Sequence, residues 1–150
     1  MPSDVRATVD IAAPPERVFE VAMAPERTPD WVTIVIRVEG YDPGPLHTGY
    51  EMRQRICLRG VPFTVGWKLT ELDAPSFARW EGRGPARSRA MIENRLEAVD
   101  GGTRFTYTNA FKTPFGPLGA VAAGALMGGL PEREATASLA RLRALIEDEL

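Results

Sequence analysis

Four polar side chains stand at positions where the alternation of the sequence expects apolar residues. They are Gln54, Asn94, Tyr107 and Asn109. Burying an amide without a hydrogen-bond partner costs about 1–3 kcal/mol. These side chains therefore bond to one another, to the backbone or to water near the strand ends, or they bind a carbonyl or hydroxyl group of a ligand. The sequence leaves both interpretations open.

Aromatic residues accompany these polar groups. Trp31, Tyr50, Trp67 and Trp80 offer flat apolar walls suited to an aromatic or polyene guest. Core packing explains Trp67 equally well. The sequence does not decide whether Trp80 points into the core, because Phe77 and Trp80 lie on opposite faces of their predicted strand and only one of them can point inward.

Several other chemistries are excluded. The chain has one cysteine, Cys57, and one histidine, His47, which excludes a disulfide framework and a Cys-rich metal site. Cys57 falls on an arginine-bearing strand face and His47 in a Pro/Gly loop, so we expect no catalytic pair. No phosphate-binding loop occurs. We predict no metal and no cofactor.

The charges balance, with 18 Lys+Arg against 20 Asp+Glu and a net charge of −2. This balance gives no electrostatic case for binding nucleic acid or an anionic membrane. Arginines do form a stripe along the outward strand rows, at Arg53, Arg55, Arg59, Arg87, Arg89 and Arg95. Glu51, Glu93 and Glu97 share those rows, so we expect cross-strand ion pairs on a solvated face and no nucleic-acid partner.

The 150 residues fit one domain, residues 1–150. Asp4 and Arg6 interrupt any apolar signal-peptide region, and the apolar stretch 115–130 is shorter than the roughly 20 residues that span a bilayer. We expect a cytoplasmic protein without a membrane span, as a monomer or homodimer.

Alternation and turn signals predict the elements that position these residues. A strand at 5–11 precedes a helix that begins at Pro14-Pro15 and a short second helix or turn at 25–30. Six strands follow, at 31–38, 50–58, 63–69, 77–82, 87–97 and 103–109. A long helix begins near Pro131, and its apolar face comprises Ala135, Leu139, Leu142, Ile146 and Leu150.

The stretch 114–129 is rich in glycine, which lowers helix stability by about 1 kcal/mol per residue relative to alanine. A helix weakened in this way is consistent with a gate that opens over a pocket. Close packing of a helix on the sheet would also call for small residues. The sequence does not decide between the two.

Three segments carry a resemblance to a known family. They are VDIAAPPERVFEVAMAPERTPDW near the start, GGTRFTYTNAF before the final helix and LARLRALIEDEL at the end. Together they resemble the helix-grip superfamily (SRPBCC or START-like), in its polyketide cyclase/dehydrase-like bacterial branch. The resemblance implies an α+β fold in which a curved antiparallel sheet of about seven strands, in the order β-α-α-β6-α, wraps around a long C-terminal helix. It also implies a ligand cavity between sheet and helix.

On this basis we expect a carrier or binding protein for a hydrophobic, partly oxygenated small molecule that is polyketide- or lipid-like. The predicted ligand-binding residues are Trp31, Tyr50, Gln54, Trp67, Trp80, Asn94, Tyr107 and Asn109. One alternative is a polyketide cyclase, aromatase or dehydratase acting by aldol cyclisation, with Tyr107 and Asn109 as catalytic candidates. Family cyclases often place an arginine in the pocket. Here only Arg79 or Arg83 could take that place, and only if the odd-numbered residues of their strand point inward. A second alternative is a stress or toxin–antitoxin component acting through protein contacts.

Overall fold

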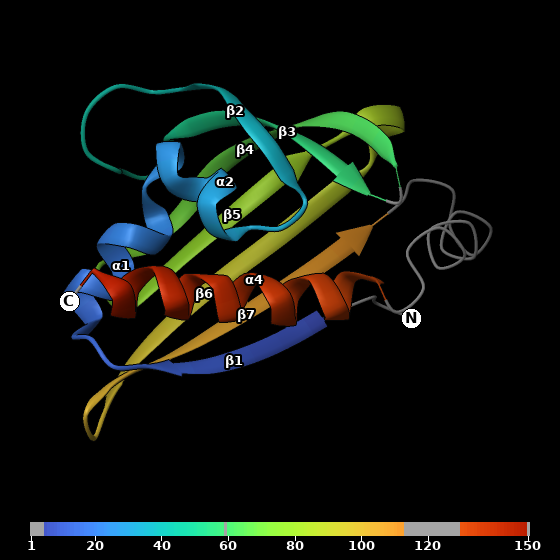
Figure 1. Cartoon of the computed structure of the whole chain (residues 1–150). Helices are drawn as coiled ribbons and strands as arrows, with labels where there is room; N and C mark the ends of the chain where they lie inside the picture. The colour runs from blue at the N-terminus through green and yellow to red at the C-terminus, as the bar shows by residue number, and fades with distance from the viewer. Residues whose placement is uncertain (1–4, 59, 113–129, 150) are drawn as a thin grey trace.

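The computed structural model describes residues 5–58, 60–112 and 130–149 (Figure 1). The elements are β1 (Val5–Ile11), α1 (Pro15–Met23), η1 (Pro25–Arg27), α2 (Thr28–Trp31), β2 (Val35–Tyr41), β3 (Glu51–Leu58), β4 (Val61–Asp73), β5 (Phe77–Arg83), η2 (Pro85–Arg87), β6 (Arg89–Val99), β7 (Gly102–Lys112) and α4 (Leu130–Asp148). The prediction of seven strands with two short helices after the first strand is confirmed. The glycine-rich stretch 114–129, predicted as a gate or as packed helix, lies outside the described residues.

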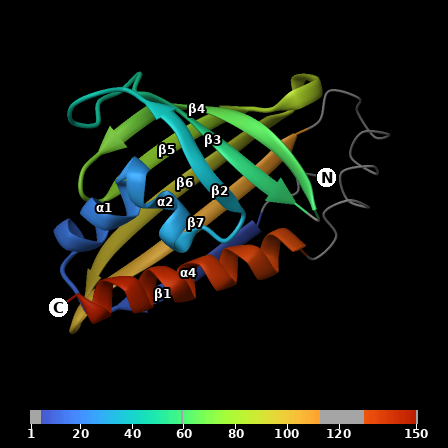
Figure 2. The same ribbon diagram turned by 45° about the horizontal axis from the view of Figure 1, so that its top comes forward.

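The strands form one antiparallel sheet in the order β1-β7-β6-β5-β4-β3-β2. Successive strands from β2 to β7 are neighbours, and β1 joins the far edge beside β7. The sheet curves around the side that carries α1, α2 and α4 (Figure 2). We call this side of the sheet the inner face and the opposite side the outer face. The predicted helix-grip architecture is therefore confirmed.

Proline residues place the short helices. Pro15, Pro25 and Pro29 each occupy the first turn of their helix, where a missing N–H costs no hydrogen bond. The prediction that a strand begins at Trp31 is wrong. The Val32 N–H donates to the Thr28 carbonyl at 2.9 Å, which closes a helical turn through Trp31. This local turn overrides the β propensity of the run, and β2 begins only at Val35.

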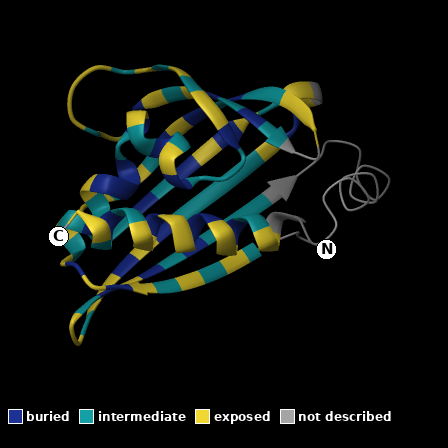
Figure 3. Ribbon diagram, viewed as in Figure 1, coloured by how far each residue is buried: buried dark blue, intermediate teal, exposed yellow. Residues whose placement is uncertain are grey.

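Burial alternates along the strands as the sequence predicts (Figure 3). α4 packs against β1, α1 and α2. Its predicted apolar face is confirmed at the described positions, where Ala135, Leu139, Leu142 and Ile146 are buried. Residue 150, the last predicted member of that face, lies outside the described residues.

Polar contacts fasten α4 to the rest of the chain. Glu149 accepts hydrogen bonds from Arg17 of α1, at 2.8 Å, and from Arg27 of η1. The Glu147 carboxylate accepts the Ala12 backbone N–H at 3.0 Å. These contacts fix the C-terminal end of the helix beside β1 and α1. None of the helices in the described ranges is both long and apolar enough to cross a membrane.

Candidate functional site

The inner face collects the predicted site residues. Tyr50, Gln54, Trp67, Trp80, Asn94 and Tyr107 are buried in its rows, and Asn109 is half-buried there. Trp31 approaches the same face from α2 and is 3% exposed. The structure therefore brings all eight predicted residues to one face of the sheet. Whether they touch a ligand is a separate question, which their hydrogen bonds help to answer.

Trp67 and Gln54 satisfy each other. The indole N–H of Trp67, on β4, donates to Oε1 of Gln54, on β3, at 3.0 Å. Gly82 provides the floor for this ring, because a Cβ atom at that position would lie 2.6 Å from Cε3 and Cζ3 of Trp67. A glycine in a strand commonly marks such a close approach. The pair therefore has a packing role that requires no ligand.

Asn94 is also satisfied within the protein, since its side-chain amide donates to the Ala78 carbonyl at 3.3 Å. It is 2% exposed. For Gln54 and Asn94, the interpretation that the polar groups find partners inside the sheet is therefore the one that the geometry favours.

The parity of β5 is now determined. Ala78, Trp80 and Gly82 face inward, and Trp80 meets the Tyr50 ring edge-on with centroids 6.1 Å apart. Burial raises the pKa of the Tyr50 hydroxyl above its ordinary value. Phe77 faces outward, with the Arg95 guanidinium 4.8 Å from its ring centroid.

The inner face therefore lacks the arginine that would favour a cyclase. Arg79 lies on the outer face, where Nη1 is 3.5 Å from the Glu93 carboxylate. Arg83 is exposed on the same outer face. The inward rows of the described strands contain no Asp, Glu, His, Lys or Arg.

Trp31, which packs beside Tyr107, carries a polar atom on the inner face that is not satisfied by the described residues. The Trp31 ring stands edge-on to Tyr107, with centroids 6.4 Å apart, and to Phe105, at 6.3 Å. Its Nε1 atom is buried and has no hydrogen-bond partner among the described residues. A buried indole N–H normally finds an acceptor. The sequence analysis treated Trp31 only as an apolar wall and missed this donor, although every buried tryptophan raises the question of its acceptor.

Tyr107 can act only as a neutral group near physiological pH. Burial raises the pKa of its hydroxyl to about 12, while a hydrogen bond with the Asn109 side chain opposes that rise. The Tyr107 hydroxyl and the Trp31 indole are therefore both hydrogen-bond donors on the same part of the inner face. This arrangement suits the recognition of an oxygen acceptor.

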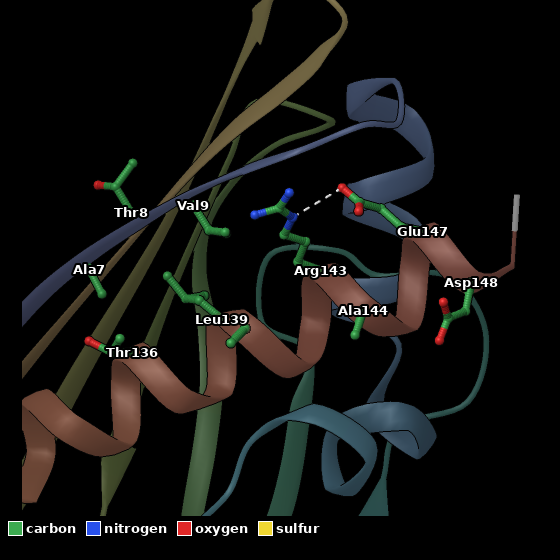
Figure 4. A pocket seen from close by; sticks show the side chains of 10 residues that line it. Ala7, Thr8, Val9, Thr136, Leu139, Arg143, Ala144, Glu147 and Asp148 are labelled. Carbon is green, nitrogen blue, oxygen red and sulfur yellow. Dashed lines mark hydrogen bonds and ion pairs between the residues drawn. The ribbon is translucent and has the colours of Figure 1, made fainter.

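An open groove of about 640 Å³ lies elsewhere, between β1 and α4 (Figure 4). Its wall includes small side chains such as Ala7, Ala140 and Ala144. Its charged end is already paired, because Arg143 Nε donates to Glu147 at 3.3 Å and Glu147 accepts the Ala12 N–H. Thr136 and Asp148 also line the groove. A hollow on the inner face itself stays a prediction.

Cys57 and His47 do not meet. His47 precedes β3 and packs against the Tyr50 ring, with centroids 5.8 Å apart, whereas Cys57 lies near the other end of β3. Within the described ranges, no group of three or more His, Cys, Asp or Glu side chains could hold a metal ion.

Ion pairs do form on the outer face, but at cations other than the predicted arginine stripe. Besides Arg79 with Glu93, Arg104 donates to Asp10 at 3.0 Å, and Lys68 lies 3.8 Å from Glu51. The described arginines of the predicted stripe form no ion pair with another described residue; they are Arg53, Arg55, Arg87, Arg89 and Arg95. The prediction that the arginine stripe forms cross-strand ion pairs is therefore wrong at these five positions.

Comparisons with known proteins agree with this architecture. The chain is 34% identical over 112 residues to an uncharacterized protein of Mycobacterium tuberculosis, a match that covers 71% of this chain and 64% of the relative. The chain thus spans less than two thirds of that relative's length.

Two solved structures show the same fold. The Zhui aromatase/cyclase of Streptomyces sp. R1128 has a TM-score of 0.81 and 21% identity, over 98% of this chain and 94% of the other. A protein of Thermus thermophilus has a TM-score of 0.76 and 20% identity, over 97% of this chain and 98% of the other.

A family model described as "Polyketide cyclase / dehydrase and lipid transport" matches residues 2–147. This match spans the elements from β1 to α4 that form the sheet and its covering helices. The chain therefore belongs to the polyketide cyclase/dehydrase and lipid transport family.

Proposed function

We propose that this protein binds a hydrophobic, partly oxygenated small molecule, polyketide- or lipid-like, against the inner face of its sheet and serves as a carrier or binding protein. The family supports a ligand of this class. The aromatic rings of Trp31, Tyr50 and Trp80 supply apolar contact area. The indole N–H of Trp31 carries the proposal, because it has no partner among the described residues and can donate a hydrogen bond to an oxygen atom of the ligand.

Binding is favoured over catalysis by the chemistry of the inward rows. An aldol cyclisation needs a group that removes a proton from carbon and donors that stabilise the enolate oxygen. Donors are available in Trp31 and Tyr107. A base is harder to supply, because the described inward rows hold no carboxylate, imidazole or amine. A tyrosine whose pKa is about 12 is a poor base at neutral pH.

A cyclase or dehydratase is the second candidate, supported by the neutral Tyr107 hydroxyl as a proton donor. This second function requires that the protein convert a poly-β-ketone mimic into product. In that case Tyr107→Phe slows turnover more than it weakens binding of the mimic. A carrier instead retains its ligand through purification, which native mass spectrometry detects.

The direct test is Trp31→Phe, which removes the indole N–H and keeps an aromatic ring. Two probes that differ in one acceptor, 2-acetylnaphthalene and 2-ethylnaphthalene, are titrated calorimetrically. We expect the substitution to weaken binding of the ketone about fivefold, since a net hydrogen bond is worth about 1 kcal/mol, and to leave the hydrocarbon within about twofold.

Tyr41→Phe is the matched control, because Tyr41 is 50% exposed on β2. It should change neither affinity. Equal losses for both probes would assign Trp31 a packing role alone. Failure of both probes to bind the unaltered protein would refute the assignment of the inner face as a site for such ligands.

A further inference from the structure

The outer face carries a row of cations that the sequence does not reveal. Strand register places Arg53 of β3 opposite Gly66 of β4, Gly66 opposite Arg83 of β5, and Arg83 opposite Arg89 of β6. The next partner, on β7, is Lys112. We call Arg53, Arg83 and Arg89, with Gly66 between them, the arginine row.

The row is left without counter-charge. All three arginine side chains are exposed, and none forms an ion pair with another described residue. Like charges directly opposite each other in a sheet are destabilising. Arg83 and Arg89 are direct register partners. The fold therefore maintains a repulsive arrangement that its own described residues do not neutralise.

Gly66 adds a second, independent observation. It lies in the middle of β4, and a Cβ atom built on it would meet nothing within 4 Å. Packing inside the chain therefore does not require glycine here. A glycine in a strand interior often marks a place where another backbone or a ligand approaches closely. At this position the glycine leaves the backbone between Arg53 and Arg83 uncovered by a side chain of its own.

The neighbouring row limits the shape of the partner. Two residues along the strands, Glu51 pairs in register with Lys68, and Lys68 with Glu81. This row of two glutamates and one lysine lies about 7 Å from the arginine row. A duplex nucleic acid or a flat anionic membrane would bring its own negative charge over Glu51 and Glu81. A single narrow chain avoids them.

The length of the row matches such a chain. From β3 to β6 the row crosses three strand spacings, about 14 Å. Side chains on one side of an extended peptide recur about every 7 Å, so such a peptide offers several carboxylates to the row. Guanidinium groups bind carboxylates in bidentate fashion. The row contains no aromatic side chain on which unpaired bases would stack.

We propose that the arginine row is a docking site for an extended acidic segment of a partner protein. The segment crosses the strands over Gly66, and its carboxylates pair with Arg53, Arg83 and Arg89. This site lies on the opposite face of the sheet from the proposed ligand site. It therefore does not depend on the identity of any small molecule.

Binding of a fluorescent octaglutamate peptide at low ionic strength tests the proposal. We expect saturable binding that weakens as salt is added. The double variant Arg83→Glu, Arg89→Glu should lower the affinity at least about tenfold. Arg6→Glu, Arg133→Glu changes the net charge equally at two exposed positions outside the row and should stay within about twofold. The single neutral variant Arg89→Gln, with circular dichroism as a check on folding, should show a partial loss of about threefold.

Three results would overturn the proposal. One is no binding of the peptide at low ionic strength. Another is equal loss of binding in the row and control variants, which would indicate a diffuse charge effect. The third is tighter, row-dependent binding of oligothymidylate or of phosphatidylserine vesicles, which would assign the row to a nucleic acid or a membrane. Unchanged naphthalene binding by the row variants keeps this test separate from that of the inner face.

Discussion

On the inner face of the sheet, Gln54 and Trp67 bond to each other across two strands, whereas on the outer face Arg83 and Arg89 stand opposite each other with no carboxylate between them. Both faces belong to the same strands. The inner face is buried, so an unpaired polar atom there costs about 1–3 kcal/mol, and its polar groups Gln54 and Asn94 are paired. The outer face is exposed to solvent. Water and salt screen the charges there, so the repulsion between arginines is tolerated.

Two exceptions to this pattern are the groups on which the two proposed sites rest. Trp31 is unpaired where burial makes that expensive. The arginine row is unpaired among the described residues of a face on which some other cations meet opposite charges across strands, as Arg104 does with Asp10. Exceptions of this kind are expected at sites that bind something outside the chain.

The largest effect should come from breaking the inner pair. Trp67→Phe removes the indole N–H and leaves the Gln54 amide oxygen buried without its donor. We expect a loss of about 2 kcal/mol in the free energy of unfolding, measured by urea denaturation. The double variant Trp67→Phe, Gln54→Leu should recover part of that loss, because both polar groups are then gone. Strictly additive losses would show that the two side chains are not coupled.

A smaller effect of opposite sign is expected on the outer face. Arg89→Thr removes one member of a like-charged opposed pair and should raise the free energy of unfolding by about 0.2–1 kcal/mol. Added sodium chloride should stabilise the unaltered protein more than the variant, because salt screens the repulsion that the variant lacks.

Arg95→Thr provides the matched control on the same strand and face. It gains the same β-branched side chain but loses the contact with the Phe77 ring. It should be neutral or destabilised. Stabilisation of both variants to the same extent would trace the effect to β propensity instead of charge.

Much of the inner face could be predicted from the sequence, because alternation fixes which residues share a face. Gln54, Asn94 and Tyr107 were found in this way, as polar residues in apolar rows. Their partners could not be found, since the Ala78 carbonyl that accepts from Asn94 belongs to a different strand, in a register that the sequence does not give. The start of β2 was misplaced because a local turn at Thr28 outweighs β propensity.

The arginine row could not be predicted from the sequence for the same reason. Arg53, Arg83 and Arg89 are distant in sequence, and their alignment follows from the register of three successive strand pairs. The sequence showed glutamates among the arginines and therefore suggested general pairing. The sheet instead collects Glu51 and Glu81 in one row and the arginines in the next.

The paired charges at the end of α4 give the smallest predicted effect and complete the contrast with the unpaired row. The hydrogen bond from Arg27, assisted by Arg17, holds the pKa of Glu149 below its ordinary value. Its stabilising contribution is therefore present above the unfolded-state pKa, about 4.3, and is lost as the pH falls through the lower folded-state pKa.

Glu149→Gln should consequently lower the thermal midpoint at neutral pH, and the difference from the unaltered protein should shrink as the pH falls through the lowered folded-state pKa, where the native carboxylate is protonated. Glu71→Gln, at an exposed carboxylate on β4, controls for the loss of one charge. A difference in thermal midpoint that stays constant with pH would mean that Glu149 acts through packing. A gap that closes would show that α4 is held at this end by charge pairing, which the arginine row lacks within the described chain.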